Sequence, residues 1–188
     1  QHMAEDARTH VGNHALADDL AQVRAQGLYR PLTVLSYLVD RAVLGHAARA
    51  TPYVIENVLL HVACAALVYD LVRRAVRRTW LAAAAAALFA LHPVATEAVT
   101  NVVGRADVLA TLGVLGGLSC WIRGTATHGG ARAAWGLGLA LASAVAFFSK
   151  ESGLVLAAAI VLWDVAFARA RPRREHLVVG LVLAGYLA

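Results

Sequence analysis

Long apolar runs alternate with short polar links along most of this 188-residue chain. A helix of about 20 apolar residues crosses the hydrocarbon core of a bilayer, and flanking residues or neighbouring helices complete a shorter run. The pattern therefore predicts an all-α fold, a polytopic transmembrane helix bundle. The expected spans lie near residues 53–72, 79–91, 106–122, 134–148, 153–168 and 177–188.

The first 52 residues follow a different pattern. Residues 1–27 are polar and contain the adjacent acids Glu5 and Asp6. Residues 28–45 place their apolar side chains near helical spacing, with Asp40 and Arg41 on the other face, which is typical of an amphipathic helix on a membrane surface. We therefore expect two regions: residues 1–52 form a loop with a surface helix, and residues 53–188 form the membrane bundle.

Composition supports the membrane assignment. Hydrophobic residues make up 60% of the chain, charged residues 15%, and the mean hydropathy is +0.61. Soluble domains have roughly 45–50% apolar and about 25% charged residues. These values exclude a disordered chain, a collagen-like fibre and an ordinary soluble enzyme.

The distribution of arginine predicts how the bundle is oriented. The links at 73–78, 123–132 and 169–174 together hold ten Arg residues, whereas the intervening links hold one cation each, Arg105 and Lys150. Lys and Arg concentrate in cytoplasmic loops of membrane proteins. We therefore place the Arg-rich links in the cytoplasm and the N-terminal acids outside the cell or in a lumen. This accounts for the net charge of +5 without a nucleic-acid partner.

The outward links contain more ionisable side chains than a connecting loop needs. Ionisable groups at membrane depth are costly and usually face a cavity or a partner. Singly, these groups are also compatible with interfacial ion pairs, Arg105 with its neighbour Asp107 or Lys150 with Glu151. Their occurrence on one side together with the acid pair favours an outward-facing cleft. The residues concerned are His92, Glu97, Arg105, Asp107, Lys150 and Glu151.

Several polar residues inside the runs predict packing rather than chemistry. Asn57 and His61 are four residues apart, share a helix face, and are expected to bond to neighbouring helices. Cys64 and Cys120 are expected to be small buried hydrophobes. No spacing typical of a metal site occurs, although a carboxylate-lined site is compatible with a divalent cation.

Two acids near the helix ends and several glycines are expected to have structural roles. Asp70 and Asp164 lie near the cytoplasmic ends, where each is expected to pair with a nearby Arg. Small residues let membrane helices approach closely. The glycines expected at such close contacts are Gly113, Gly116, Gly117, Gly136 and Gly138.

Five groups of residues occur in one order along the chain and resemble a known family. The family is that of the transmembrane and tetratricopeptide-repeat O-mannosyltransferases and their bacterial relatives, within the type-C glycosyltransferase superfamily. The matching segments are Tyr29-Arg30-Pro31-Leu32-Thr33; Asn57-Val58-Leu59-Leu60-His61; Leu91-His92-Pro93 with Thr96-Glu97-Ala98-Val99; Gly104-Arg105-Ala106-Asp107; and Ser149-Lys150-Glu151.

The resemblance implies a multi-span enzyme that uses a polyprenyl-phosphate-linked sugar on the outer or lumenal face. Such enzymes carry an acidic pair in the first outward loop, and Glu5-Asp6 fits that place. The family pattern more often has two Asp, so Glu5 is a departure. A span before the acid pair and the later spans and repeats have no counterpart in these 188 residues. The chain is therefore similar to an N-terminal fragment of the membrane half.

The chemistry of such a transfer assigns expected roles. The acceptor hydroxyl needs a base, for which Asp6 is the first candidate and Glu5 the second. The leaving phosphate gains negative charge, which Arg105, Arg30 or Lys150 can stabilise. His92 and Glu97 are candidates for positioning the sugar or the acceptor. The expected partners are a lipid-linked donor, a protein or peptide acceptor and membrane lipid. A transporter or lipid flippase and a non-catalytic membrane scaffold remain alternatives.

Overall fold

The computed structural model describes residues 30–44 and 50–168. The chain forms two compact units, Gln1–Arg30 and Pro31–Ala188, and the described residues lie almost entirely in the second. All regular structure in these residues is helical, which confirms the all-α membrane bundle. The elements are α2 (Pro31–Val39), η1 (Asp40–Leu44), α3 (Ala50–Val76), α4 (Thr79–Leu91), α5 (Val94–Thr100), η2 (Val102–Gly104), α6 (Arg105–Thr125), α7 (Gly129–Ser149), η3 (Glu151–Leu154), α8 (Val155–Trp163) and η4 (Asp164–Ala168).

Three helical segments are long and apolar enough to cross a membrane: Thr51–Val76, Val102–Thr125 and Gly129–Ser149. They contain the expected spans near 53–72, 106–122 and 134–148. The expected run 79–91 is α4, and the run 153–168 is divided among η3, α8 and η4. The run 177–188 lies outside the described residues.

The axes of α4 and α5 differ in direction by 61°. Together the two helices are long and apolar enough to form one broken membrane span or a re-entrant loop. Proline lacks a backbone N–H and its ring clashes with the preceding helical turn. Pro93 accordingly follows His92, whose extended backbone ends α4. The imidazole Nδ1 of His92 accepts a hydrogen bond from the backbone N–H of Val94, at 3.2 Å, at the start of the next helix.

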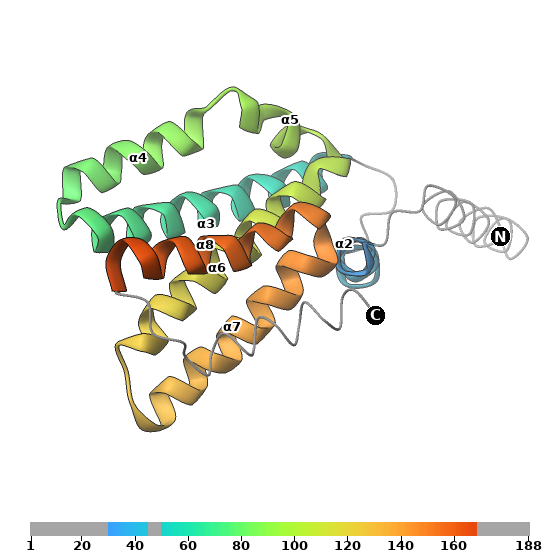
Figure 1. Ribbon diagram of the computed structural model, residues 1–188. Helices are drawn as coiled ribbons and strands as arrows, with labels where there is room; N and C mark the ends of the chain where they lie inside the picture. Colours follow the sequence, from blue (N-terminus) through green and yellow to red (C-terminus); the bar gives the residue numbers. More distant parts are fainter. Residues whose placement is uncertain (1–29, 45–49, 169–188) are drawn as a thin grey trace, which may run out of the picture. The chain divides into compact units, whose positions relative to one another are not determined.

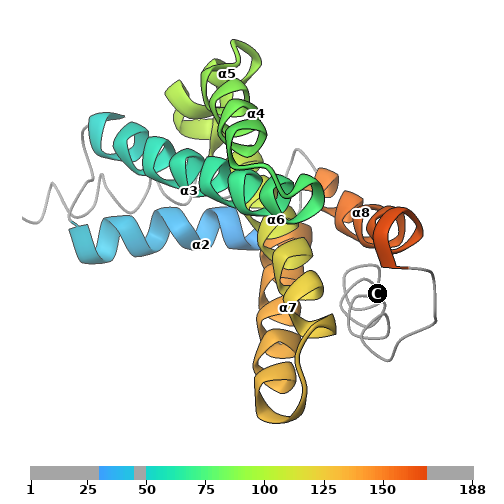
Figure 2. The same ribbon diagram turned by 90° about the vertical axis from the view of Figure 1, so that its left-hand side faces the viewer.

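The best-packed part of the bundle is the hairpin of α6 and α7 with α8 against it (Figures 1 and 2). A Cβ added at Gly113 would lie 2.5 Å from the backbone nitrogen of Ala146, so only glycine permits this approach. Gly117 and Gly138 are also close-packing positions, as expected, whereas Gly136 faces open space. The core around these contacts consists of Trp121, Leu139, Ala146, Phe147, Leu156 and Ile160.

The segment expected to form a surface helix contains α2, and its position on a membrane surface stays a prediction. In α2 the apolar side chains Leu35, Leu38 and Val39 are exposed, whereas Thr33 is buried. The carboxylate of Asp40, which follows α2, contacts the bundle rather than solvent alone. Asp40 therefore turns toward the bundle, whereas Arg41 and the apolar side chains of Leu35, Leu38 and Val39 are exposed.

The polar links collect at two opposite ends of the bundle. One end holds α2, the starts of α3 and α6, and the end of α7, while the other holds the α3–α4 and α6–α7 turns (Figure 1). Asp70, near the end of α3, accepts hydrogen bonds from Arg74 and Arg123 at 2.8 Å, as its sequence position predicts. Among the links that the structure describes, the Arg-rich links 73–78 and 123–132 and the Arg-poor links therefore lie at two different ends; the Arg-rich link 169–174 lies outside the described residues.

Candidate functional site

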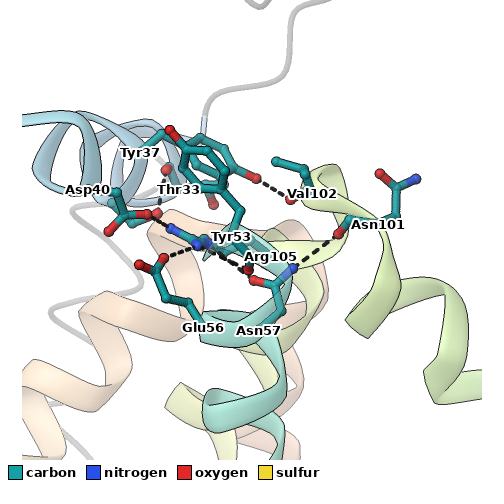
Figure 3. A network of polar contacts seen from close by, with 10 residues as sticks. Thr33, Tyr37, Asp40, Tyr53, Glu56, Asn57, Asn101, Val102 and Arg105 are labelled. Atoms are coloured by element: carbon teal, nitrogen blue, oxygen red, sulfur yellow. Dashed lines mark hydrogen bonds and ion pairs between the residues drawn. The ribbon is translucent and has the colours of Figure 1, made fainter. Parts of the chain in front are cut away.

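Arg105 is the centre of a polar network at the Arg-poor end (Figure 3). It is the first residue of α6, and its side chain is only 2% exposed. Its Nε donates to the Oδ1 of Asn57 at 3.1 Å, and its two terminal nitrogens donate to the carboxylates of Asp40 and Glu56. A second bond from Nη2 reaches the backbone carbonyl of Tyr53 at 3.5 Å. One guanidinium thus connects η1, α3 and α6.

Two tyrosine rings enclose this guanidinium. The Cζ of Arg105 lies 4.9 Å from the ring centroid of Tyr37 and 5.5 Å from that of Tyr53, within the range of a cation–π contact. The rings meet edge to face at 6.1 Å. The hydroxyl of Tyr37 donates to the carbonyl of Val102 at 2.5 Å. Burial raises the pKa of Tyr37, Arg105 opposes the rise, and Asp40 and Tyr53 add to it.

Local sequence places Arg105 in this position. A Cβ added at Gly104 would lie 2.2 Å from the carbonyl oxygen of Ala98, so glycine lets the turn before α6 lie against α5. The side chain of Asn101 accepts a hydrogen bond from the N–H of Val103, and its carbonyl accepts one from the amide of Asn57. This turn fixes the first residue of α6 beside α3.

A second ion pair lies at the same end of the bundle. The ammonium of Lys150 contacts the Oδ1 of Asp107, and their side chains are 28% and 45% exposed. Next to it, the hydroxyl of Thr33 donates to the carbonyl of Ser149 at 3.1 Å, which joins α2 to the end of α7. Unlike the guanidinium of Arg105, this pair is accessible from outside the protein.

The structure thus pairs the charges of the Arg-poor links with partners that are distant in sequence. Arg105 pairs with Asp40 and Glu56 rather than with its near neighbour Asp107, which instead meets Lys150. The Arg105 cluster contains one cation and two carboxylates. A buried charge left without such partners is strongly destabilising. These contacts make Arg105 a fixed anchor between helices.

The remaining predicted site residues are placed as follows. His92 and Glu97 are exposed on the link between α4 and α5 and on α5, and Glu151 is exposed at the start of η3. Glu5 and Asp6 lie outside the described residues. Arg30 is the last residue of the other compact unit.

Asn57 and His61 form the interhelical bonds expected of them. Asn57 bonds to Asn101 and Arg105, as described above, and is fully buried. The Nε2 of His61 lies 3.3 Å from the carbonyl of Ala90, and its ring stacks on Phe89 with centroids 5.0 Å apart. This pair therefore holds α3 against α4 and α6.

Sequence reasoning missed the acidic partners of Arg105. The sequence pattern predicts Asp40 on the polar face of a surface helix, and Glu56 is not among the predicted site residues. Both acids lie in apolar segments that contain few cations, which was the available signal. Neither residue type nor spacing shows that the partner of these acids is Arg105, which lies 65 positions from Asp40 and 49 positions from Glu56.

Within the residues that the structure describes, no group of three or more His, Cys, Asp or Glu side chains could hold a metal ion. The predicted acid pair lies outside these residues.

Comparison with known proteins identifies the relatives of this chain. The family described as dolichyl-phosphate-mannose-protein mannosyltransferase matches residues 42–188. The mouse protein O-mannosyl-transferase TMTC2 is 36% identical over 139 residues, 73% of this chain and 16% of its own length. The human TMTC4 is 30% identical over 154 residues, 73% of this chain and 21% of its own length.

The chain therefore spans about one sixth of the length of the first of these relatives, mouse TMTC2. No solved structure matches it significantly. Because this family matches residues 42–188, which include the whole α3–α8 bundle, the chain belongs to the dolichyl-phosphate-mannose-protein mannosyltransferase family.

Proposed function

We propose that the full-length protein is an integral-membrane glycosyltransferase. It moves a sugar, mannose, from a polyprenyl-phosphate donor to a Ser or Thr hydroxyl of a protein on the outward face. Family membership and the names of the relatives support the class of reaction. The observation that supports the proposal is that two separate Arg-poor links meet at one end, where Lys150 contacts Asp107, two residues from the anchored Arg105.

The reaction is a displacement at the anomeric carbon. The acceptor oxygen forms a bond to this carbon as the bond to the phosphate oxygen breaks, and the phosphate leaves with the electron pair. A single displacement inverts the anomeric configuration. The proton of the acceptor hydroxyl passes to a carboxylate, Asp6 in our proposal with Glu5 as the second candidate. A positioned general base contributes roughly 10²–10⁴-fold.

The two cations at this end have different roles in our proposal. Lys150 is partly exposed and can approach the leaving phosphate, whose developing charge a cation stabilises. Arg105 is buried and acts as a positioning residue, which holds the segment after α2 on α3 and α6. A divalent cation at the acid pair would suit the same chemistry, since carboxylate oxygens are hard ligands. The residues proposed to contact phosphate, sugar or acceptor are Arg30, His92, Glu97, Asp107, Lys150 and Glu151.

Substitution of the acid pair in the full-length enzyme tests the proposal. Asp6→Asn keeps the shape of the side chain but removes the basic oxygen, so we expect transfer to fall by at least roughly 10²-fold with expression unchanged. Glu5→Gln tests the second candidate, and Asp18→Asn is the matched control in the same polar segment. Transfer is measured in membranes from a radiolabelled polyprenyl-phosphate sugar and normalised to protein.

Near wild-type transfer in both Asp6→Asn and Glu5→Gln would show that the acid pair is not the base. Movement of the labelled lipid across the membrane without transfer, in the wild-type protein, would favour the flippase alternative.

A further inference from the structure

A pocket of about 490 Å³ opens at the Arg-rich end of the bundle, away from the Arg105 network. Figure 1 shows the end of α3, the start of α4 and the end of α8 near each other on its left side. The lining residues come from these elements and from α6: Arg73, Arg74, Arg77, Thr79, Ile122 and Trp163. Three guanidinium groups, a hydroxyl and two apolar side chains therefore border one space.

The charge at this pocket is unbalanced. Asp70 receives hydrogen bonds from Arg74 and Arg123 at 2.8 Å, and Arg73 lies 3.9 Å from its other oxygen. One carboxylate is thus shared among three guanidinium groups, and Arg77 adds a further positive charge at the rim. Clustered charges of one sign raise the local concentration of ligands of the other sign.

The backbone of Arg77, which lines this pocket, has a left-handed conformation. Arg77 has φ of +56°, and no other non-glycine residue in the described part of the chain has a positive φ. It follows the last residue of α3, and its N–H bonds to the carbonyl of Arg73 at 3.0 Å. Glycine is usual at this left-handed position after a helix. Arg77 occupies this position in place of glycine, and it also lines the pocket.

We propose that this pocket binds the phosphate headgroup of an anionic membrane lipid. Guanidinium groups bind phosphate oxygens through paired hydrogen bonds, and the hydroxyl of Thr79 is a further donor. Ile122 and Trp163 supply apolar surface for the glycerol and upper acyl chain, and tryptophan favours the membrane interface. The positive-inside rule places this Arg-rich end in the cytoplasmic leaflet, where anionic lipids are concentrated.

This site is separate from the proposed sugar transfer, which uses the opposite end. Its test therefore does not depend on whether the transfer proposal holds. The purified full-length protein in detergent is titrated with phosphatidylglycerol and, separately, with phosphatidylcholine, and bound lipid is counted by native mass spectrometry. We expect phosphatidylglycerol to bind at least roughly fivefold more tightly, from the typical contribution of one Arg near a charged lipid.

The matched variants are Arg77→Ala and Arg78→Ala. They remove the same charge from neighbouring positions, but Arg78 does not line the pocket and makes no side-chain bond at the start of α4. We expect Arg77→Ala to weaken phosphatidylglycerol about fivefold and Arg78→Ala to change it less than about twofold. Arg77→Gly should weaken lipid binding equally while raising the melting temperature, because glycine tolerates the left-handed backbone. Weaker lipid binding together with a higher melting temperature in Arg77→Gly would show that misfolding does not cause the loss of binding.

Equal binding of the two lipids would overturn the proposal, and so would equal losses in Arg77→Ala and Arg78→Ala. Inorganic phosphate is the competing source of the same chemistry. If millimolar inorganic phosphate displaces phosphatidylglycerol from the wild-type protein, the ligand is a soluble phosphate and the lipid assignment is wrong. Persistence of the lipid under that competition supports it.

Discussion

Arg105 holds four partners at one point of the bundle, and its fork of five donors explains why this residue type is needed. It reaches the carboxylates of Asp40 and Glu56, the amide of Asn57 and a backbone carbonyl at the same time. A lysine ammonium is a point charge with three donors and cannot reproduce this planar arrangement. The identity of the cation therefore matters here more than its charge.

Replacing this residue tests its role as an anchor. We expect Arg105→Met to destabilise the protein by about 3–5 kcal/mol, because it leaves two carboxylates without their buried partner. Arg105→Lys should have a smaller but clear effect. Thermal unfolding in detergent, followed by fluorescence, measures both.

The matched control for this comparison is Arg41→Met, which makes the same change at an exposed residue beside Asp40. It should shift stability by less than about 0.5 kcal/mol. A similar melting temperature for Arg105→Met and the wild-type protein would refute the anchoring role.

At the scale of elements, the α6–α7 hairpin depends on small residues at the points of closest approach. Gly113 contacts the backbone of α7 at Ala142 and Ala146, where a methyl group would meet backbone atoms that cannot move alone. Helices in lipid associate through such close packing, because burial of apolar surface gives little advantage there. The hairpin in turn positions Lys150, which follows the last residue of α7.

Two glycine substitutions separate packing from helix propensity. Gly113→Ala should destabilise the hairpin by about 1–3 kcal/mol through overpacking. Gly136→Ala, with open space around its Cβ, should instead stabilise α7 by roughly 0.5–1 kcal/mol. Opposite shifts in melting temperature are the expected result. The packing account fails if both variants shift stability in the same direction.

At the scale of the whole molecule, the two ends differ in charge and in accessible chemistry. The Arg105 network and the Lys150–Asp107 pair lie at one end, and the Arg-lined pocket lies at the other. The proposed transfer on one face and the proposed lipid site on the other both require a defined orientation in the membrane. The distribution of Arg predicts that orientation.

Cysteine labelling tests the orientation directly. In a background with Cys64 and Cys120 replaced by Ala, a cysteine is introduced at Glu97 or at Val76, both of which are exposed. We expect an impermeant maleimide to label Glu97→Cys in intact cells and Val76→Cys only after permeabilisation. Labelling of Val76→Cys in intact cells would reverse the topology.

The sequence by itself determined the fold class, three of the long helices and the separation of Arg-rich from Arg-poor ends. These features follow from local properties, because hydrophobic length decides what crosses a membrane and Pro93 decides where α4 stops. The shared face of Asn57 and His61 followed from helical spacing in the same way. The acid pair at positions 5 and 6 and the roles given to it stay predictions.

Only the tertiary structure decided which charges meet. Asp40 lies 65 positions from Arg105, and Lys150 lies 43 positions from Asp107, so no local period relates them. The same long-range contacts turn the carboxylate of Asp40 inward, although the sequence pattern alone indicated a polar face in water. Partner choice depends on how distant helix ends pack together, because a buried charge is stable only where the fold brings its counter-charge to it.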